Sequence, residues 1–341
     1  MGPAPIKVLV VDDSAFARKV VRECLSVAGI EVVGIARDGL EALEKIAELT
    51  PDVITLDMVM PNLDGVGVLK ALAGKPSPRV VVVSMSDTDS LLGLAALREG
   101  AFEVVHKPTA LAISQLYEIG EKLVAVVRAA AMSPQRTAIA GPLGTVAISH
   151  PGTSRQLLVI GASTGGPQAL TRLVTSLPAN FPVPVAIVLH IPPGYTAAFA
   201  ARLNEACALE VLEASEGLEL QVGRVVVARA GRHLTVRRAD GVLQCVLDLH
   251  PLESLHRPSV DVLFESAAEV ARSATLAVVL TGMGDDGLIG SRAIRAVGGT
   301  IITEAASSCV VYGMPRVVNE AGLSAAEAPI ELMVDQIIRF L

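Results

Sequence analysis

The sequence contains no tryptophan, and aromatic residues account for only 3% of its 341 positions. Stacking of bases on aromatic rings, on which many single-stranded nucleic-acid binders depend, is therefore disfavoured. An excess of positive charge is missing as well. Residues 1–154 have 14 Lys and Arg against 17 acidic residues, and residues 155–341 have 14 Arg, no Lys and 18 acidic residues. Because both parts are acidic, we expect no nucleic-acid partner.

Paired cysteines and membrane signals are also lacking. The cysteines lie far apart and form no C-x-x-C pair, which disfavours zinc and redox motifs and favours buried thiols in a reducing compartment: Cys24, Cys207, Cys245 and Cys309. The first residues do not have the layout of a secretory signal, and no apolar run approaches about 18 residues. We therefore expect a cytoplasmic protein that does not insert into a membrane.

The length and the 51% apolar content favour two α/β domains whose sheets are buried on both faces. In residues 1–128, apolar strands alternate with amphipathic helices five times, which predicts a doubly wound parallel sheet. The expected strands are 6–11, 31–36, 52–56, 79–83 and 104–106. Residues 129–154 are rich in Pro, Gly, Ser and Thr and are expected to be a linker. Residues 155–341 are expected to form the second domain, a doubly wound, Rossmann-like and mainly parallel sheet with an antiparallel β-hairpin addition.

Chemically unusual residues follow the strands of the first domain. Asp12 and Asp13 follow the first strand, and Asp57 follows the third. Ser84 ends the fourth, and Lys107 ends the fifth. Three crowded carboxylates repel one another unless a hard cation lies between them, and Mg²⁺ is the usual choice for oxygen ligands. Asp57 could then attack phosphorus, while the metal and Lys107 neutralise the phosphoryl oxygens.

These strand ends are similar to those of a response-regulator receiver domain, which has a flavodoxin-like fold. The resemblance is carried by VLVVDDSAFARKV, DVITLDMVMPNLDG, VVVVSM and the His-Lys-Pro step at 106–108. It implies that a sensor histidine kinase supplies a phosphoryl group. It also implies a role for each polar residue: Asp57 is the phospho-acceptor, Asp12 and Asp13 bind Mg²⁺ with it, Ser84 contacts the phosphoryl group and Lys107 pairs with it. The position of Val104 departs from the family, which often has an aromatic switch residue there.

The second domain begins with LLVIGASTGG, residues 157–166, a buried strand followed by a Gly-rich turn and a helical pattern. Ser163 lies on that turn, although the stretch contains no G-x-S-x-G, G-x-G-x-x-G or phosphate-loop motif. A second apolar strand ends at His190, and a third leads into a loop with Asp285 and Asp286. Because these strands belong to one parallel sheet, their ends could assemble a nucleophile, a base and the carboxylate that orients the base.

Several alternatives stay open at this level. Residues 208–250 are predicted to form β-hairpins with a turn at 239–241, and three further histidines in or beside them compete with His190 for the base: His233, His250 and His256. We prefer His190 because it ends a buried strand like that before Ser163. The competing functions are a response regulator with a DNA-binding output and one with a catalytically silent docking module. Acidic charge and the absence of a helix-turn-helix pattern weigh against the first.

The second domain resembles the effector domain of the chemotaxis protein-glutamate methylesterases, the CheB family. GASTGG, LHIPPGYTAAFAARLN, HRPSVDVLF, TGMGDDG and SSCVVYGMPR carry the resemblance. It implies hydrolysis of glutamate γ-methyl esters, and deamidation of glutamines, on methyl-accepting chemotaxis receptors. In it Ser163 is the nucleophile, His190 the base, Asp286 its orienting acid and the backbone of Met283 part of the oxyanion hole. Residues 228–231 depart from the family's Ala-Pro-Gly-Asp. Mg²⁺ serves the receiver alone, the catalytic domain needs no cofactor, and a monomer is expected.

Overall fold

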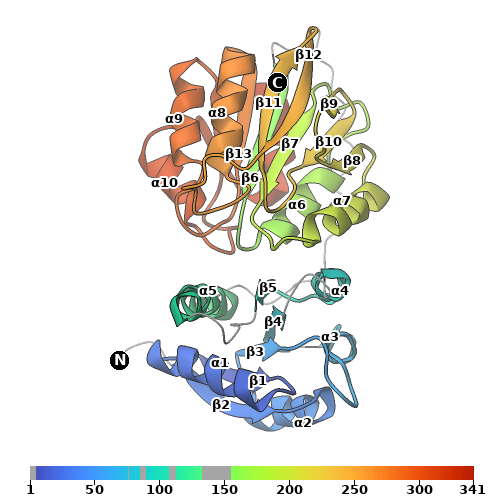
Figure 1. Ribbon diagram of the computed structural model, residues 1–341, viewed down its shortest axis with the longest axis vertical. Coiled ribbons are helices and arrows are strands. Elements are labelled where there is room, and N and C mark those ends of the chain that lie inside the picture. Colours follow the sequence, from blue (N-terminus) through green and yellow to red (C-terminus); the bar gives the residue numbers. More distant parts are fainter. Residues whose placement is uncertain (1–4, 76, 85–89, 107–112, 133–154) are drawn as a thin grey trace. The chain divides into compact units, whose positions relative to one another are not determined.

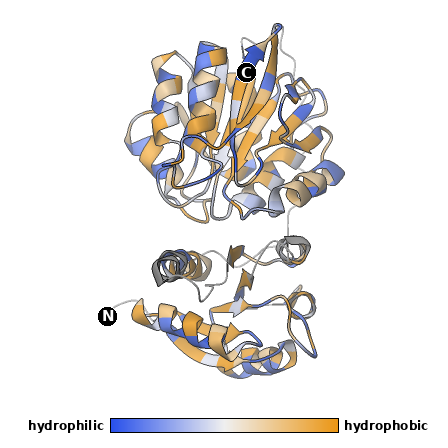
Figure 2. Ribbon diagram, in the orientation of Figure 1, coloured by the Kyte–Doolittle hydropathy of each residue, from blue (hydrophilic) through white to orange (hydrophobic). Residues whose placement is uncertain are grey.

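The computed structural model describes residues 5–75, 77–84, 90–106, 113–132 and 155–341, and the chain divides into two compact units, Met1–Thr137 and Ala138–Leu341 (Figure 1). In both units the hydrophobic residues concentrate on the strands and on the helix faces that cover them (Figure 2). Each unit is described by itself. The expected linker, 129–154, overlaps the last helix of the first unit up to residue 132, and the rest of it lies outside the described ranges.

The first unit is a five-stranded parallel sheet with strand order β2-β1-β3-β4-β5. Its strands agree with the expected ranges to within one residue: β1 Lys7–Val11, β2 Glu31–Ala36, β3 Val53–Leu56, β4 Arg79–Ser84 and β5 Glu103–His106. The helices are α1 Ala15–Val27, α2 Gly39–Leu49, α3 Gly65–Leu72, α4 Ser90–Glu99 and α5 Ile113–Met132. Helices α1 and α5 pack together, while α3 packs against both α2 and α4. The flavodoxin-like prediction is confirmed.

The second unit is built on a seven-stranded parallel sheet with strand order β15-β14-β13-β6-β7-β10-β8. Its strands are β6 Leu157–Ala162, β7 Val185–Leu189, β8 Glu210–Glu213, β10 Arg224–Val227, β13 Thr275–Val279, β14 Thr300–Glu304 and β15 Ala326–Ala328. The helices are α6 Gly166–Thr175, α7 Tyr195–Ala206, α8 Val260–Ala271, α9 Leu288–Ala296, α10 Met314–Glu320 and α11 Met333–Phe340. β6, β7 and β13 are completely buried because helices cover both faces of the sheet.

A small antiparallel sheet, β11-β12-β9, is added to the second unit, as expected. Its strands are β9 Glu219–Leu220, β11 His233–Ala239 and β12 Val242–Asp248. Asp240 and Gly241 join β11 to β12 with φ of 50° and 84°, the left-handed conformation that a two-residue hairpin turn requires. Leu234 and Cys245 of this sheet share one core with Phe264 of α8. Helix α8 therefore has apolar partners in both the hairpin and the main sheet.

One prediction in this region was wrong. The hairpin pattern was expected throughout 208–250, but β8 and β10 pair with each other in parallel inside the main sheet. The chain between them, which includes β9, leaves the main sheet to pair with β12, and it returns in its original direction. Alternation along a strand shows that one face is buried, and it does not specify the direction of the neighbouring strand.

All four cysteines are free thiols, and burial raises the pKa of Cys207 to about 11 and that of Cys245 to about 12. These two thiols are therefore unreactive at neutral pH.

Among the helices that the structure describes, none is both long enough and apolar enough to cross a membrane.

Candidate active site and phospho-acceptor site

The residues expected to form the esterase site follow three strands that are neighbours in the main sheet, β13, β6 and β7. The N–H of Ser163, just after β6, donates to the carbonyl of Thr281 beyond β13 at 3.0 Å. The N–H of His190, just after β7, donates to the carbonyl of Ala162 at 3.1 Å. The parallel ladders thus continue past the strands, and they bring the three loops to the same edge of the sheet.

The turn that carries Ser163 needs its glycines. Gly165 has φ of 80° and precedes α6, and a Cβ on it would collide with the side chain of Val310. The N–H of Gly166 donates to the carbonyl of Ser163 at 2.7 Å, which closes the turn. Ser163 itself is partly exposed at the start of this turn. The sequence therefore folds into a tight strand-to-helix connection that presents one hydroxyl at the sheet edge.

Asp286 is hydrogen-bonded to His190, with 2.9 Å between its Oδ2 and Nε2 of the imidazole. Both side chains are nearly buried, at 7% exposed for His190 and 10% for Asp286. The other ring nitrogen, Nδ1, is buried and has no hydrogen-bond partner within the described part of the chain. Because an ionised carboxylate only accepts hydrogen bonds, Nε2 must carry the proton. Nδ1 of a neutral His190 is then an unprotonated lone pair, which is what a general base needs.

The amino terminus of α8 holds the carboxylate of Asp286. Oδ1 accepts from Ser259 Oγ at 2.9 Å and from the N–H of Asp261 at 2.8 Å, while Oδ2 accepts from the N–H of Val260 at 2.8 Å. Burial acts to raise the pKa of Asp286. The hydrogen bond and charge of His190 and the α8 N–H donors outweigh burial, so the pKa lies well below its usual range. Asp286 is therefore ionised at neutral pH.

The structure brings Asp286, and not Asp285, to His190. Asp285 is exposed, and its backbone carbonyl accepts from the N–H of Leu288 at the start of α9. Asp261 secures the same loop, because its Oδ1 accepts from the N–H groups of Gly287 at 2.9 Å and Gly290 at 2.7 Å. The two helices thus exchange caps, with Asp286 at the amino terminus of α8 and Asp261 at that of α9. Helices α8 and α9 lie side by side (Figure 1).

Ser259 and Asp261 were missed as site residues by the sequence reasoning. Both lie in the HRPSVDVLF stretch, and a Ser immediately before an apolar helical pattern is a recognisable helix cap. That signal could locate the amino terminus of α8. It could not show that the helix end receives a carboxylate from a loop 25 to 27 residues further along the chain.

The competing histidines lie in different environments. His233 is buried, and its two ring nitrogens contact the N–H of Ser259 and the carbonyl of Pro251, both at 3.2 Å. His250 is exposed and pairs with Asp248 at 3.2 Å. His256 stacks on His190, with ring centroids 4.1 Å apart and an angle of 27° between the rings. Of the four, His190 has the carboxylate partner that is buried at the sheet edge.

Met283 lies on the loop that passes directly beside Ser163. A Cβ on Gly282 would stand 2.9 Å from the Cβ of Ser163, which shows how closely the two loops approach. Thr281 ties them together, because its Oγ1 donates to the carbonyl of Thr164 at 3.0 Å. In the part of the chain that the structure describes, the N–H of Met283 donates to no backbone carbonyl, and Met283 is about half exposed.

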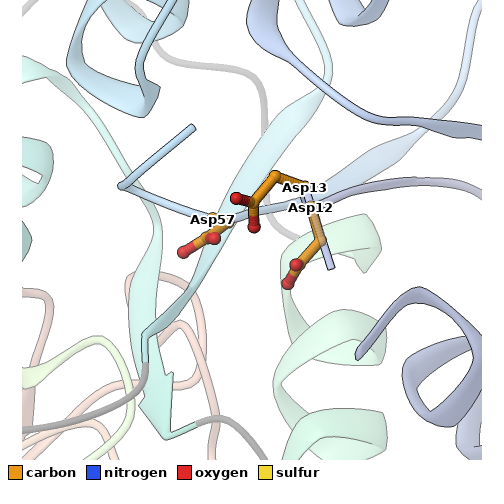
Figure 3. A group of neighbouring side chains, drawn as sticks. All are labelled: Asp12, Asp13 and Asp57. Carbon is orange, nitrogen blue, oxygen red and sulfur yellow. The ribbon is translucent and has the colours of Figure 1, made fainter. Parts of the chain in front are cut away.

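The acidic cluster of the first unit forms where β1 and β3 end. Val11 pairs with Leu56, and the N–H of Asp57 donates to the carbonyl of Val11 at 2.9 Å. Carboxylate oxygens of Asp12, Asp13 and Asp57 come within 4.8 Å of one another (Figure 3). Three clustered carboxylates supply only hard oxygen ligands, so the donor set fits Mg²⁺.

The other receiver residues are less fully described. Ser84 is the last residue of β4, and Lys107 lies outside the described residues. Val104 is 3% exposed and belongs to the core. The roles of Ser84 and Lys107 stay predictions.

Each of the two units is similar to a known protein family. Residues 158–337 match the CheB methylesterase family, and residues 8–118 match the response regulator receiver domain. The chain is 60% identical over 336 residues to protein-glutamate methylesterase/protein-glutamine glutaminase 5 of Myxococcus xanthus, with 97% of each chain covered. It is 39% identical to the protein-glutamate methylesterase/protein-glutamine glutaminase of Thermotoga maritima, with 98% of each covered. The crystal structure of the Thermotoga maritima CheB methylesterase catalytic domain superposes with a TM-score of 0.54, at 39% identity, over 55% of this chain and 100% of that one.

Proposed function

The chain belongs to the CheB methylesterase family, with a receiver domain before the catalytic domain, and from this we propose how its own residues carry out that family's reaction. It is a carboxylic ester hydrolase that removes methyl groups from glutamate γ-methyl esters and deamidates glutamines. Its substrates are methyl-accepting chemotaxis receptors, and a sensor histidine kinase is the phosphodonor of its receiver. A cytoplasmic location and a monomeric state remain predictions.

Ser163, His190 and Asp286 act as nucleophile, base and orienting acid in this proposal. The observation that carries it is the buried hydrogen bond between Nε2 of His190 and ionised Asp286, which leaves Nδ1 as the basic nitrogen. The hydroxyl of Ser163 attacks the ester carbonyl and gives its proton to Nδ1. The imidazolium, stabilised by Asp286, then protonates the leaving oxygen, and methanol departs.

The second half of the reaction uses the same groups. The glutamyl ester on Ser163 is attacked by water, which gives a proton to Nδ1 of His190. That proton returns to the oxygen of Ser163 when the glutamate carboxylate is released. With a glutamine side chain the leaving group is ammonia, and the remaining steps are identical. The N–H of Met283, on the loop beside Ser163, stabilises the negative oxygen of each tetrahedral intermediate.

The receiver supplies the control. Asp57 is proposed as the phospho-acceptor, with Asp12 and Asp13 holding Mg²⁺ beside it, because the three carboxylates come together where β1 and β3 end. Bound Mg²⁺ would neutralise charge on the transferred phosphoryl group. Ser84 and Lys107 are proposed to contact that group, by resemblance to the family. Phosphorylation adds negative charge at this edge and reweights the conformations of the chain, which activates the esterase.

Ser163→Ala tests the assignment. Release of methanol from methylated receptor should fall by several orders of magnitude, because only binding and oxyanion stabilisation would remain. Ser176→Ala is the matched control, since Ser176 caps the opposite end of α6 and its hydroxyl donates to the carbonyl of Arg172. A Ser163→Ala enzyme with a near-normal rate would remove Ser163 as the nucleophile. Ammonia release from a receptor with glutamine at the same positions should be lost in parallel.

A further inference from the structure

His256 makes a contact in the esterase site that the mechanism above does not use. Its ring stacks on that of His190 at a centroid distance of 4.1 Å and an angle of 27°. His256 lies on the segment between β12 and α8 and is exposed, whereas the side chain of His190 is only 7% exposed. An exposed ring thus lies against one face of the buried ring proposed as the base.

The segment that carries His256 is held in place at both ends by buried His233. Nδ1 of His233 accepts from the N–H of Ser259, so Nε2 carries the ring proton and donates to the carbonyl of Pro251. Burial lowers the pKa of His233, which favours this neutral form. Within the segment, the guanidinium of Arg257 donates to a backbone carbonyl at 3.0 Å. These hydrogen bonds hold the loop that carries His256, and they place His256 beside His190.

The stacked ring of His256 restricts how the imidazole ring of His190 can turn. The hydrogen bond to Asp286 fixes Nε2, but the ring plane can still turn about the line that joins Nε2 to the carboxylate oxygen. Turning the plane moves Nδ1, the atom that must receive the proton of Ser163. A ring stacked on the face opposes this rotation, because offset stacking is favourable only over a narrow range of orientations.

We propose that His256 is a positioning residue of the esterase site, whose ring holds the imidazole plane of His190 so that Nδ1 stays directed for proton transfer. This inference rests on the proposed role of His190 as the base. His256 acts through His190 and has no proton-transfer role of its own. A ring that stacks but cannot exchange protons should therefore replace it.

Three variants in the full chain test this, with phosphodonor present. His256→Ala removes the ring, His256→Phe keeps a stacking ring without nitrogen, and His250→Ala removes an exposed histidine of the same segment that pairs with Asp248. We expect His256→Ala to lower kcat for methanol release by about tenfold or more, equivalent to about 1.4 kcal/mol in the barrier, with KM within about twofold. His256→Phe should recover kcat to within about threefold of the native enzyme. The control variant, His250→Ala, should have the native kcat.

Other outcomes would overturn the proposal. These are a His256→Ala enzyme within about twofold of native kcat, a His256→Phe enzyme as slow as His256→Ala, or a loss confined to KM. Thermal unfolding of each variant checks the fold, and His256→Leu, which keeps bulk without a ring, replaces Ala if that variant unfolds. Ser163→Ala in the same assay separates the hypotheses. If the native enzyme is no faster than Ser163→Ala, the proposed function itself has failed, whereas an active native enzyme that is insensitive at His256 refutes only the positioning role.

Discussion

Replacing Asp286 by Asn tests the centre of the esterase site. Both carboxylate oxygens accept two hydrogen bonds each, from His190, Ser259 and two backbone N–H groups of α8. An amide has a single oxygen, so either orientation places its NH₂ against one of those N–H groups. A buried donor left unsatisfied costs about 1–3 kcal/mol. We therefore expect Asp286→Asn to lower the free energy of unfolding by about that amount at pH 7.

Activity should fall as well, because both orientations impair His190 as the proposed base. With the NH₂ toward His190, Nε2 must accept, the proton moves to Nδ1, and the ring cannot take a proton from Ser163; a wrong tautomer lowers kcat about 10⁴-fold in such triads. With the amide oxygen toward His190, the tautomer survives but the charge that stabilises the imidazolium is lost. Hydrogen bonds to charged groups contribute about 1.5–3 kcal/mol, or roughly 10- to 100-fold. We expect kcat to fall by about 10-fold to 10⁴-fold, depending on which orientation the amide adopts.

The assay compares Asp286→Asn with Asp285→Asn for methanol release and for unfolding in urea. Asp285 is exposed and contributes its backbone carbonyl to the loop, so its variant should stay within about twofold of native in kcat. The folded-state pKa of Asp286 is lowered, so its stabilisation is present above the unfolded pKa of about 3.9 and is lost as the pH falls further. The stability difference caused by Asp286→Asn should accordingly shrink below about pH 4. A larger loss from Asp285→Asn would refute the reasoning.

Three other changes probe the surroundings. Burial, reinforced by the neighbouring charge of Asp286, raises the pKa of Asp261 to about 6, so native stability should fall as the pH rises from about 4 through 6. Asp261→Asn keeps an oxygen that can accept both hydrogen bonds. Its free energy of unfolding, measured in urea at pH 4.5 and 7.5, should therefore depend less on pH than that of the native chain. An unchanged pH dependence would show that Asp261 is not its source. Gly282→Ala places a Cβ 2.9 Å from that of Ser163 and against Met314, and kcat should drop by about 100-fold. A near-native kcat for Gly282→Ala would show that the 281–286 loop can shift to accommodate the added methyl group. Asp57→Ala should abolish stimulation of methanol release by a small phosphodonor, and retained stimulation would exclude Asp57 as the acceptor.

Local patterning predicted most of the architecture. Apolar strands alternating with amphipathic helices are read from a few neighbouring residues, and parallel strands with helical crossovers bring their carboxyl ends to one edge. That rule alone placed Asp12 beside Asp57, and Ser163 beside His190 and the 281–286 loop. The glycines at 165 and 166 also marked the turn that carries Ser163. The direction of β8 and β10 was missed because it depends on β9 pairing with distant β12.

The choice among chemically equivalent residues came only with the folded chain. Asp285 and Asp286 are adjacent and identical, and no local pattern separates them; resemblance to a family did so at the level of sequence. In the fold, the amino terminus of α8 accepts one of them, and that helix begins 26 residues earlier in the chain. The same holds for His190, His233 and His256, which differ in whether they meet a carboxylate, two backbone groups or another ring. Burial and partners of a polar side chain are set by segments remote in sequence, so their energetics follow from packing and not from the residue type.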